Sequence, residues 1–487
     1  MTAALAYGGS VVDGAELERR AARAASGLER LGIAEGDVVA LMLYNSPAFI
    51  EAMLACRQLG AYSCPINWHF KADEAGFVLR DSGAKALIVQ AALLEQIASG
   101  VPSGLPLVTV EPGWTEWREA HAPWSGAART PRGNMPYTSG TTGRPKGVRR
   151  APATEAQRAL AATLYRQALG IEPGMRALLS APLYHSAPNL YAAQVMLNGA
   201  LLVLEQRFDA EATLALIERY AITNAYLVPT MFVRLLRLPH EMRRRYDLSS
   251  LRFVCSTGSP CAPEVKRAMI DWLGPIITET YASSEAGHVT LIDSPTWLAR
   301  PGSAGRPLGE GVVKILDDAG RELPPGEIGL IYCRQPAYPD FTYTNNAAAR
   351  ASIEKHGLWS VGDMGYLDAD GYLYVADRKS DMVISGGVNI YPAEIEAALM
   401  TMPAVADCAV FGIPDAEYGE ALAAAIELRE GARAGANEVQ DYLRGRIANY
   451  KVPRVISFHE RLPREESGKI YKRLLREPYW AAAGRRI

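Results

Sequence analysis

The stretch VVALMLYNSPAFIEAMLACRQLGAYSCPIN (residues 38–67) decides the fold class. Residues 38–43 form an unbroken apolar run, which is typical of a buried strand. Residues 47–60 have the length and composition of a helix, and residues 62–67 predict a second strand. A strand, a crossover helix and a second strand in this order imply a parallel sheet. We therefore predict an α/β protein with a doubly wound parallel sheet.

The same kind of unit recurs along the first three hundred residues. Apolar and small residues from Leu17 to Leu31 fall on one helical face, and Gly32 supplies a stop. Further strands are predicted at residues 177–182, 201–205, 224–229 and 251–257, with a helix at residues 209–220. At 487 residues the chain is too long for one core of usual size. We expect a large N-terminal domain followed by at least one other domain.

The texture of the chain changes after Pro301, where short strands alternate with Gly, Pro and Asp turns. The sharpest break is VADRKSDMVISGGVNIYPAEIE (residues 375–396), in which a strand ends in charged residues and a helix restarts at Pro392. About a hundred residues follow, which is enough for a domain. We place a hinge at Asp377, between an N-terminal domain of residues 1–376 and a C-terminal domain of residues 378–487.

Composition excludes several classes of protein. The formal net charge is -2, so no global basic field favours nucleic acid as a partner. Hydrophobic residues at 49% and charged residues at 21% are typical of a soluble globular protein. None of the six cysteines forms a Cys-x-x-Cys pair, which favours reduced thiols. With no signal peptide pattern and no apolar run of transmembrane length, we expect a cytoplasmic protein.

The segment TSGTTGRPKG (residues 138–147) has the composition of a phosphate-binding loop. Its glycines allow successive backbone N–H groups to converge on an anion, and its hydroxyl groups and Lys146 add further donors. The P-loop of NTPases requires Gly-x-x-x-x-Gly-Lys-Ser/Thr, but here Pro145 precedes Lys146 and Gly147 follows it. The loop is therefore predicted to bind phosphate in another way.

Five more stretches carry groups suited to phosphate, carboxylate or ribose. They are YHSAPN (residues 184–189), YASSEAG (281–287), WSVGD (359–363), DRKSDMVISGG (377–387) and PREESGK (463–469). Together with TSGTTGRPKG, in this order, they resemble the motifs of the adenylate-forming superfamily, in its acyl-CoA synthetase branch. The resemblance implies a multi-sheet N-terminal domain with doubly wound parallel sheets and a distorted β-barrel. It also implies a small, mobile α+β C-terminal domain.

The resemblance implies two half-reactions. A carboxylate attacks the α-phosphate of ATP to give an acyl-adenylate, and coenzyme A then displaces AMP. The residues implied to hold the phosphates are Thr138, Ser139, Gly140, Thr141, Thr142, Gly143, Lys146 and Ser284. Those implied around the nucleoside are Gly258, Ser259, Tyr281, Ala282, Ser283, Asp363 and Arg378. Glu285 is the implied ligand of Mg²⁺. The motif has Ala282 where glycine is usual and Ser284 where threonine is usual.

The C-terminal motifs are implied to serve the two steps in turn. Lys469 would enter the site for adenylation and bridge the carboxylate and the α-phosphate. Rotation about Asp377 would then withdraw it and bring in Ser385, Gly386 and Gly387, where glycines let a pantetheine arm pass close to the backbone. His185, Thr141, Lys146, Glu285 and Lys469 are the predicted catalytic residues.

The acid is predicted from the motif YHSAPN and its neighbours. Relatives that activate amino acids carry an aspartate in this motif, and here there is none, so an amino acid is not expected. His185 is expected to orient the carboxylate or to gate the channel for the thiol, and the alternative is a structural role. Mostly small or apolar residues favour an aryl acid such as a hydroxycinnamate over a fatty or alicyclic acid. The predicted pocket residues are Tyr184, Ala187, Asn189, Leu190, Met231, Phe232 and Gly302, with Gly258 and Ala282.

Alternatives remain open at this point. The acyl acceptor could be an amine or a carrier protein, although no carrier domain follows. A non-catalytic acyl- or nucleotide-binding relative is the hypothesis from another class, and it predicts loss of the charged positions. The chain retains Lys146, Glu285, Asp363, Arg378 and Lys469, which favours an enzyme. We expect a monomer or a homodimer.

Overall fold

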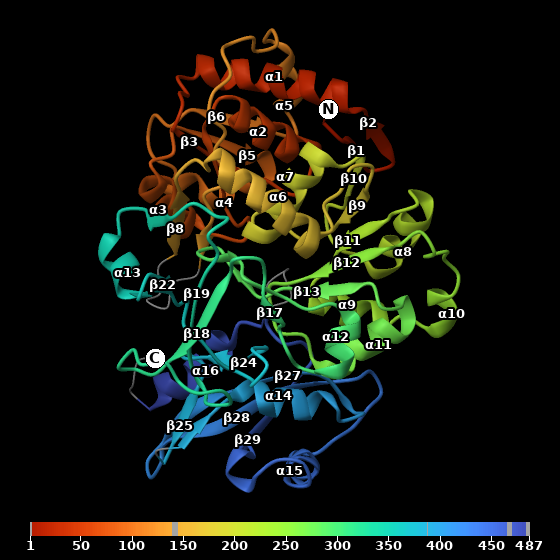
Figure 1. Cartoon of the computed structure of the whole chain (residues 1–487), viewed down its shortest axis with the longest axis vertical. Helices are drawn as coiled ribbons and strands as arrows, with labels where there is room; N and C mark the ends of the chain where they lie inside the picture. The colour runs from red at the N-terminus through yellow and green to blue at the C-terminus, as the bar shows by residue number, and fades with distance from the viewer. Residues whose placement is uncertain (1, 139–144, 387, 465–469, 484–487) are drawn as a thin grey trace.

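The computed structural model describes residues 2–138, 145–386, 388–464 and 470–483. Figure 1 shows the N-terminal part of the chain, in red to yellow, at the top and the C-terminal part, in blue, at the bottom. Green strands from the middle of the sequence lie between them. The order of the domains in space therefore follows their order in the sequence.

The stretch at residues 38–67 forms the predicted parallel unit. Strand β3 (Val38–Met42) is followed by helix α2 (Pro47–Gln58) and strand β4 (Tyr62–Pro65), and the two strands pair in parallel. Strands β5 (Ala86–Gln90) and β6 (Leu107–Val110) complete the smaller parallel sheet, whose order is β4-β3-β5-β6. Helix α2 begins where sequence chemistry predicts, because the Ser46 hydroxyl accepts from the Phe49 amide and Pro47 opens the first turn.

A larger sheet has the order β13-β12-β11-β9-β10-β1-β2 and is parallel except for the last pair. Its strands are β1 (Ala4–Tyr7), β2 (Ser10–Val12), β9 (Arg176–Leu179), β10 (Leu201–Leu204), β11 (Asn224–Tyr226), β12 (Phe253–Ser256) and β13 (Ile277–Glu279). The strands predicted from residue 177 to residue 257 are thus confirmed, with shorter bounds. Helix α1 (Gly14–Arg30) buries the predicted face from Leu17 to Leu28, and Leu31 is its C-cap.

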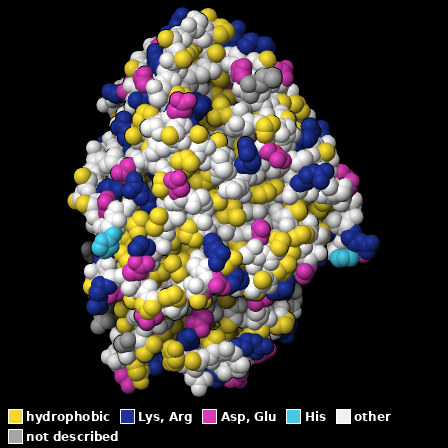
Figure 2. All heavy atoms as spheres, viewed as in Figure 1, with side chains coloured by type: hydrophobic (Ala, Val, Ile, Leu, Met, Phe, Trp, Pro, Cys, Tyr) yellow, Lys and Arg dark blue, Asp and Glu magenta, His cyan; other side chains and the backbone are white. Residues whose placement is uncertain are grey.

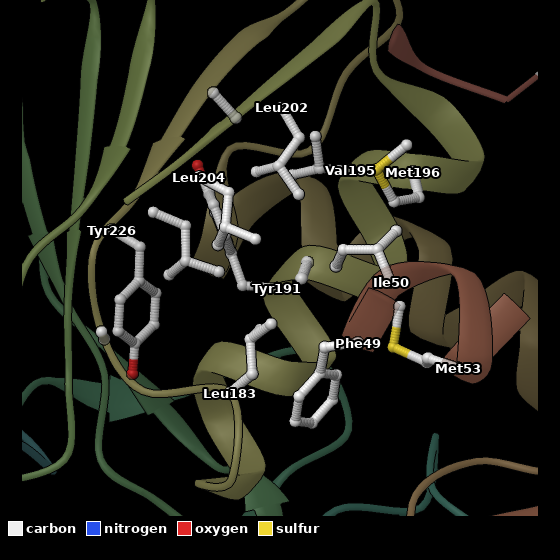
Figure 3. Close-up of a cluster of buried hydrophobic side chains, with 14 of the residues drawn as sticks. Phe49, Ile50, Met53, Leu183, Tyr191, Val195, Met196, Leu202, Leu204 and Tyr226 are labelled. Atoms are coloured by element: carbon white, nitrogen blue, oxygen red, sulfur yellow. The ribbon is translucent and has the colours of Figure 1, made fainter. Parts of the chain in front are cut away.

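One hydrophobic core joins the two parallel sheets. Helix α7 (Ser186–Asn198) lies between them, and Figure 3 shows its side chains Tyr191, Val195 and Met196 among residues of α2 and β10. Tyr191 and Val195 are fully buried, as is Phe49 of α2. Because α7 follows directly on the loop that carries Tyr184 and His185, this packing fixes the end of that loop to both sheets.

Two antiparallel sheets make up the region expected to be a distorted β-barrel. The first has the order β21-β22-β19-β23-β24, with β18 paired to β19, and the second has the order β20-β8-β7. Their strands are β7 (Tyr137–Thr138), β8 (Lys146–Arg150), β18 (Val312–Leu316), β19 (Gly329–Arg334), β20 (Phe341–Tyr343), β21 (Glu354–Lys355), β22 (Leu358–Trp359), β23 (Asp363–Leu367) and β24 (Leu373–Arg378). Strand β24 ends at Arg378, one residue after the predicted hinge.

The C-terminal part is an α+β unit with its own sheet, in the order β26-β25-β28-β27 with β29 paired to β28. Its elements are β25 (Val383–Ser385), β26 (Val388–Ile390), α14 (Pro392–Met400), β27 (Val405–Asp415), β28 (Gly419–Leu428), α15 (Ala436–Arg444), β29 (Val455–His459) and α16 (Lys472–Ala482). Two clusters of buried side chains from this part alone form its core.

Side chains of both charges intermingle over the face shown in Figure 2, in keeping with the small net charge. Within the described ranges, the helices are all too short or too polar to cross a membrane.

Candidate active site

Most predicted site residues gather in one cleft of about 3990 Å³. The loops that follow β9, β11, β12 and β13 line it, and the carboxyl ends of parallel strands are where open α/β sheets bind ligands. The cleft continues to the C-terminal domain. The predicted residues that line it are Thr138, Lys146, Tyr184, His185, Ala187, Leu190, Met231, Gly258, Ser259, Tyr281, Ala282, Ser283, Ser284, Glu285, Gly302, Asp363, Asp377 and Arg378.

Four other predicted residues lie elsewhere. Asn189 and Phe232 belong to the core behind the cleft wall, and the Asn189 side chain donates to the Leu183 carbonyl at 3.0 Å. They were predicted to line the pocket from their place in or near the motifs, but each lies on a helix beside residues that do line it, Leu190 and Met231. Ser385 and Gly386 line a separate cavity of about 440 Å³ on the C-terminal domain.

The remaining predicted residues fall outside the described ranges: Ser139, Gly140, Thr141, Thr142, Gly143, Gly387 and Lys469. The residues that flank two of these segments are informative. Thr138 and Lys146 pair across β7 and β8, so the phosphate-type loop connects two adjacent strands. Arg464 and Ile470 also pair with each other, and both line the cleft.

Glu285 is the acidic residue of the motif YASSEAG, and only 5% of its surface is exposed. Its Oε1 atom accepts a hydrogen bond from the Tyr343 hydroxyl at 2.9 Å and a longer one from the Thr138 hydroxyl at 3.4 Å. Both donors are neutral, so they orient the carboxyl group without placing a positive charge beside it. An oriented carboxylate oxygen is the kind of ligand that Mg²⁺ takes, with phosphate oxygens supplying further positions.

Tyr281, Asp363 and Arg378 form a connected group. The Tyr281 hydroxyl donates to Oδ2 of Asp363 at 2.7 Å, and the Arg378 Nε lies 3.3 Å from Oδ1. Asp363 and Arg378 are register partners on β23 and β24. Burial, and then the Asp363 charge, raise the pKa of Tyr281 well above its usual range, so the hydroxyl remains a donor. Gly258, at a φ of +96°, also lines the cleft, and no other atom lies within 4 Å of the place that a Cβ would take.

The loop after β9 carries the residues predicted to contact the acid. Tyr184 is buried and packs edge-on against Trp68, with ring centroids 4.6 Å apart. His185 is the N-cap residue of α7, and its ring is tilted by 47° against that of Tyr184, with ring centroids 4.3 Å apart. Ala187 and Leu190 extend the same wall along α7. Tyr226, at the end of β11, also lines the cleft and adds a second aromatic side chain.

Asn45 fixes the backbone of this loop from behind. Its side-chain nitrogen donates to the carbonyl groups of Ala181 and Glu205, each at 3.0 Å. Its side-chain oxygen accepts from the Leu183 amide at 2.8 Å. Asn45 is fully buried, so these bonds satisfy polar groups that would otherwise be costly. It connects the end of the smaller sheet to the loops after β9 and β10.

Glu205 is a second buried carboxyl group near the acid side of the cleft. Its Oε2 accepts from the Thr213 hydroxyl at 2.9 Å and from the Ser180 hydroxyl. Burial raises the pKa of Glu205 to about 7, and the two hydroxyl groups only partly offset this shift. The fold therefore favours the protonated form of Glu205 below neutral pH.

On the C-terminal side, charged groups meet at the predicted hinge. The Lys472 Nζ, at the start of α16, lies 2.8 Å from Glu396 of α14. Oδ2 of Asp377 accepts from the Ala393 amide in the first turn of α14 at 2.9 Å. Burial raises the pKa of Asp377, although Lys472 acts in the opposite direction. The start of α16, the start of α14 and the end of β24 are thus joined by one set of contacts.

The sequence analysis missed Asn45, Arg150, Tyr343 and Lys472. A signal existed for Arg150: it follows Lys146 and Val148 at even spacing on one strand, and alternate residues of a strand share a face. Asn45, Tyr343 and Lys472 act on segments distant in sequence, and no local pattern marks them.

Comparisons with known proteins agree with this geometry. Residues 2–338 match the family model of the AMP-binding enzyme, and residues 394–469 match that of the AMP-binding enzyme C-terminal domain. A feruloyl-CoA synthase from Amycolatopsis sp is 35% identical, over 96% of this chain and 94% of that protein. An indoleacetate–CoA ligase from Aromatoleum aromaticum is 35% identical, over 94% of this chain and 91% of that protein.

The same holds for solved structures. The o-succinylbenzoate coenzyme A synthetase from Bacillus subtilis, in complex with ATP and magnesium ion, aligns with a TM-score of 0.84 and 31% identity. The alignment covers 98% of this chain and 96% of that one. With two family models and full-length relatives in agreement, the chain belongs to the AMP-binding enzyme family, in its acyl-CoA synthetase branch.

Proposed function

We propose that this AMP-forming acyl-CoA synthetase joins a hydrophobic carboxylic acid to coenzyme A, with aryl acids such as hydroxycinnamates preferred over fatty acids. The observation that carries the proposal is the lining of the cleft beside the predicted nucleotide site. There Tyr184 and Tyr226 are aromatic, and Ala187, Leu190 and Met231 are small or apolar. An aromatic ring packs favourably against such side chains, through burial of apolar surface and ring–ring geometry.

Two of the relatives support the aryl choice. Feruloyl-CoA synthase and indoleacetate–CoA ligase are named for acids with an aromatic ring, and both are as similar to this chain as any relative reported above. A fatty or alicyclic acid is the alternative, because small and apolar linings accept alkyl chains equally well.

For adenylation, the residues around the cleft would orient the two reactants. Lys146 would hold phosphate oxygens beside the loop of residues 139–144. Lys469 would approach both the carboxylate and the α-phosphate, reducing their mutual repulsion at the distance of attack. His185, at the start of α7, would orient the acid. Positioning and charge stabilisation together lower the barrier without a covalent bond to the protein.

The nucleoside and the metal would be held on the N-terminal side. Asp363, with two accepting oxygens, suits the ribose hydroxyl groups, and Arg378 suits the same ribose or a phosphate. Tyr281 offers a ring face to the adenine, in the cleft that Gly258 also lines. Glu285 would hold Mg²⁺, which neutralises developing charge on the phosphates when bound.

For thioester formation, we propose rotation of the C-terminal domain about Asp377. Arg464 and Ile470 line the cleft here, whereas Ser385 and Gly386 line a separate cavity. This arrangement suits adenylation. A rotation would exchange the two segments, and coenzyme A would then pass the glycines to reach the acyl-adenylate. A cytoplasmic location and a monomer or homodimer remain predictions.

The experiment follows AMP and pyrophosphate release with ATP, Mg²⁺ and coenzyme A. The acids run from acetate through octanoate and palmitate to benzoate, indoleacetate and ferulate. We expect kcat/KM for the best aryl acid to exceed that for palmitate by about tenfold or more. A preference for palmitate or octanoate would replace the aryl proposal with the fatty one.

Two controls separate the remaining hypotheses. Lys469→Ala should lower adenylation by about 10²- to 10³-fold, whereas Lys314→Ala, at an exposed pair with Glu322, should leave it unchanged. Pyrophosphate release that needs no coenzyme A would indicate an amine or a carrier protein as acceptor. Nucleotide binding without turnover on any acid would indicate a non-catalytic relative.

A further inference from the structure

The side chain of Glu285 is held by an antiparallel ribbon that lies largely outside the functional motifs. Strand β20 pairs with β8, with Tyr343 opposite Val148 and Phe341 opposite Arg150. Lys146 lies at the other end of β8, and its Nζ is 5.2 Å from the centre of the Tyr343 ring. The ribbon therefore carries a lysine of the phosphate-type loop and also reaches the acidic motif.

Tyr343 contacts the carboxylate of Glu285 itself. Its hydroxyl donates to Oε1 at 2.9 Å, and its ring is buried, with 4% exposed. The bond is a charge-assisted one from a neutral donor, which is stronger than a bond between two neutral groups.

Arg150 contacts the backbone of the same motif. Its guanidinium donates to the carbonyl groups of Ser284 at 2.9 Å and of Glu285 at 2.5 Å. It also donates to the Pro339 carbonyl at 2.5 Å, and it lies over the rings of Tyr338 and Phe341. A planar guanidinium fixes the directions of its donors, which a lysine cannot do. Arg150 thereby ties the acidic motif to the loop before β20.

We propose that Arg150 and Tyr343 are positioning residues that set the place of the Glu285 carboxylate for a divalent cation bound with ATP. This inference rests on the proposed role of Glu285. Mg²⁺ requires near-ideal octahedral geometry, so a small displacement of one ligand weakens the binding of the ion. Tyr343 acts on the side chain of Glu285 and Arg150 acts on its backbone. Together they restrict both the rotamer and the position of the Cα atom.

Arg149 provides a matched control on the same strand. Adjacent residues of a strand point to opposite faces. Arg149 donates to the Gly36 carbonyl at 3.1 Å and lies 4.8 Å from the centre of the Tyr62 ring. It therefore has the same kinds of contact as Arg150, namely a carbonyl group and an aromatic ring, but they lie away from the acidic motif.

The test measures the metal-dependent part of nucleotide binding. ATP is titrated calorimetrically into the protein without acid or coenzyme A, once with Mg²⁺ and once with EDTA. The dissociation constant with EDTA is divided by the one with Mg²⁺, and this ratio is compared between variants. A variant that only loosens the fold changes both constants alike, so this ratio reports on the cation. Arg150→Met, Arg150→Lys, Tyr343→Phe and Arg149→Met are compared with wild type, and Glu285→Gln is the reference.

We expect Arg150→Met to reduce the ratio by about tenfold, as loss of an outer partner does at metal sites. Tyr343→Phe should reduce it by about threefold to tenfold, and Arg150→Lys should fall between Arg150→Met and wild type. Arg149→Met should keep the wild-type ratio. Tyr343→Phe removes one oxygen atom and keeps the buried ring, so it decides the outcome if Arg150→Met does not fold.

The reference variant distinguishes two kinds of failure. If Glu285→Gln keeps the wild-type ratio, the metal role of Glu285 is wrong, and this inference falls with it. If Glu285→Gln abolishes the effect of Mg²⁺ while Arg150→Lys and Tyr343→Phe keep the wild-type ratio, only the positioning role is overturned. An equal loss in Arg149→Met and Arg150→Met would overturn it too.

Discussion

The N-terminal and C-terminal sides of the cleft hold their carboxyl groups differently. On the N-terminal side, Glu285 and Glu205 accept hydrogen bonds from neutral hydroxyl groups of Tyr, Thr and Ser residues. On the C-terminal side, Glu396 pairs with Lys472, and Asp377 binds the first turn of a helix close to the same lysine. Glu279, paired with the buried Lys266, departs from this pattern on the N-terminal side.

The difference teaches what each side can do. A carboxyl group held by hydroxyl donors is oriented without a neighbouring positive charge, so it can receive a cation or, as at Glu205, take up a proton. A carboxylate paired with lysine is neutralised locally and links two elements. The carboxyl groups of the N-terminal side are therefore arranged to bind a cation or a proton. Those of the C-terminal side hold its helices in one arrangement. Four variants test this contrast, from the largest expected effect to the smallest.

Glu205→Gln should change how stability depends on pH. The pKa of Glu205 is raised from 4.5 to about 7 in the fold. Its contribution to the free energy of unfolding is therefore fully present below pH 4.5 and is lost as pH rises through 7. The loss is up to about 3 kcal/mol, because one pKa unit corresponds to about 1.4 kcal/mol. Urea denaturation at pH 5 and pH 8 should show a smaller decline for Glu205→Gln than for wild type. Equal declines would contradict the assignment.

Lys472→Met should destabilise the C-terminal side by about 2 kcal/mol, between the values for buried and exposed ion pairs. It leaves Glu396 without its lysine, while the Glu396 bond to the Val410 amide remains. Thermal unfolding and the rate of pyrophosphate release are measured, with Lys314→Met as the control at an exposed pair. We expect slower adenylation only in Lys472→Met. If stability and the rate of pyrophosphate release are both unchanged, the Lys472–Glu396 pair does not stabilise the C-terminal side.

Tyr281→Phe should raise the KM for ATP by about tenfold, since a hydrogen bond to a charged group contributes about 1.5 kcal/mol. Asp363 accepts from a hydroxyl on the N-terminal side and pairs with Arg378 on the C-terminal side. It is the point at which the two kinds of partner meet. Steady-state kinetics at saturating acid measure the effect. A larger loss in kcat than in kcat/KM would place Tyr281 outside the nucleotide site.

Asp377→Ala should cost about 1 kcal/mol, the usual loss for a helix N-terminus that loses its side-chain acceptor. The Ala393 amide would then have no partner from Asp377. Asp377→Asn keeps an accepting oxygen and should recover most of the stability in a thermal unfolding measurement. If Asp377→Asn is as unstable as Asp377→Ala, the charge, and not the hydrogen bond, is what stabilises α14.

Local sequence patterns predicted the helices and strands with well-marked ends. The helix from Leu17 is confirmed because its apolar spacing and the Asp13 cap agree. The strand at residues 224–229 was predicted too long, since Pro229 opens a helix, α9 (Pro229–Leu236), after only three strand residues. The prediction failed there because proline suits the first turn of a helix as well as the end of a strand.

The motifs predicted which residues line the cleft better than which residues support them. Tyr281, Asp363 and Arg378 could be grouped by their motifs, and they meet in the structure. The supports Asn45 and Tyr343 could not be predicted. Each contacts a segment more than fifty residues away, and such pairings are set by the packing of sheets and not by local spacing.

Asn45 also bears on how the pocket could be exchanged between relatives. Its side chain is hydrogen-bonded to three positions in the loops after β9 and β10, from the segment after β3, more than a hundred residues earlier. Loops transplanted from another synthetase should adopt their own conformation in this protein only if the donor enzyme also has an asparagine at the equivalent position. Chimeras that respect this anchor should retain their thermal stability, and those that break it should lose stability before they change selectivity.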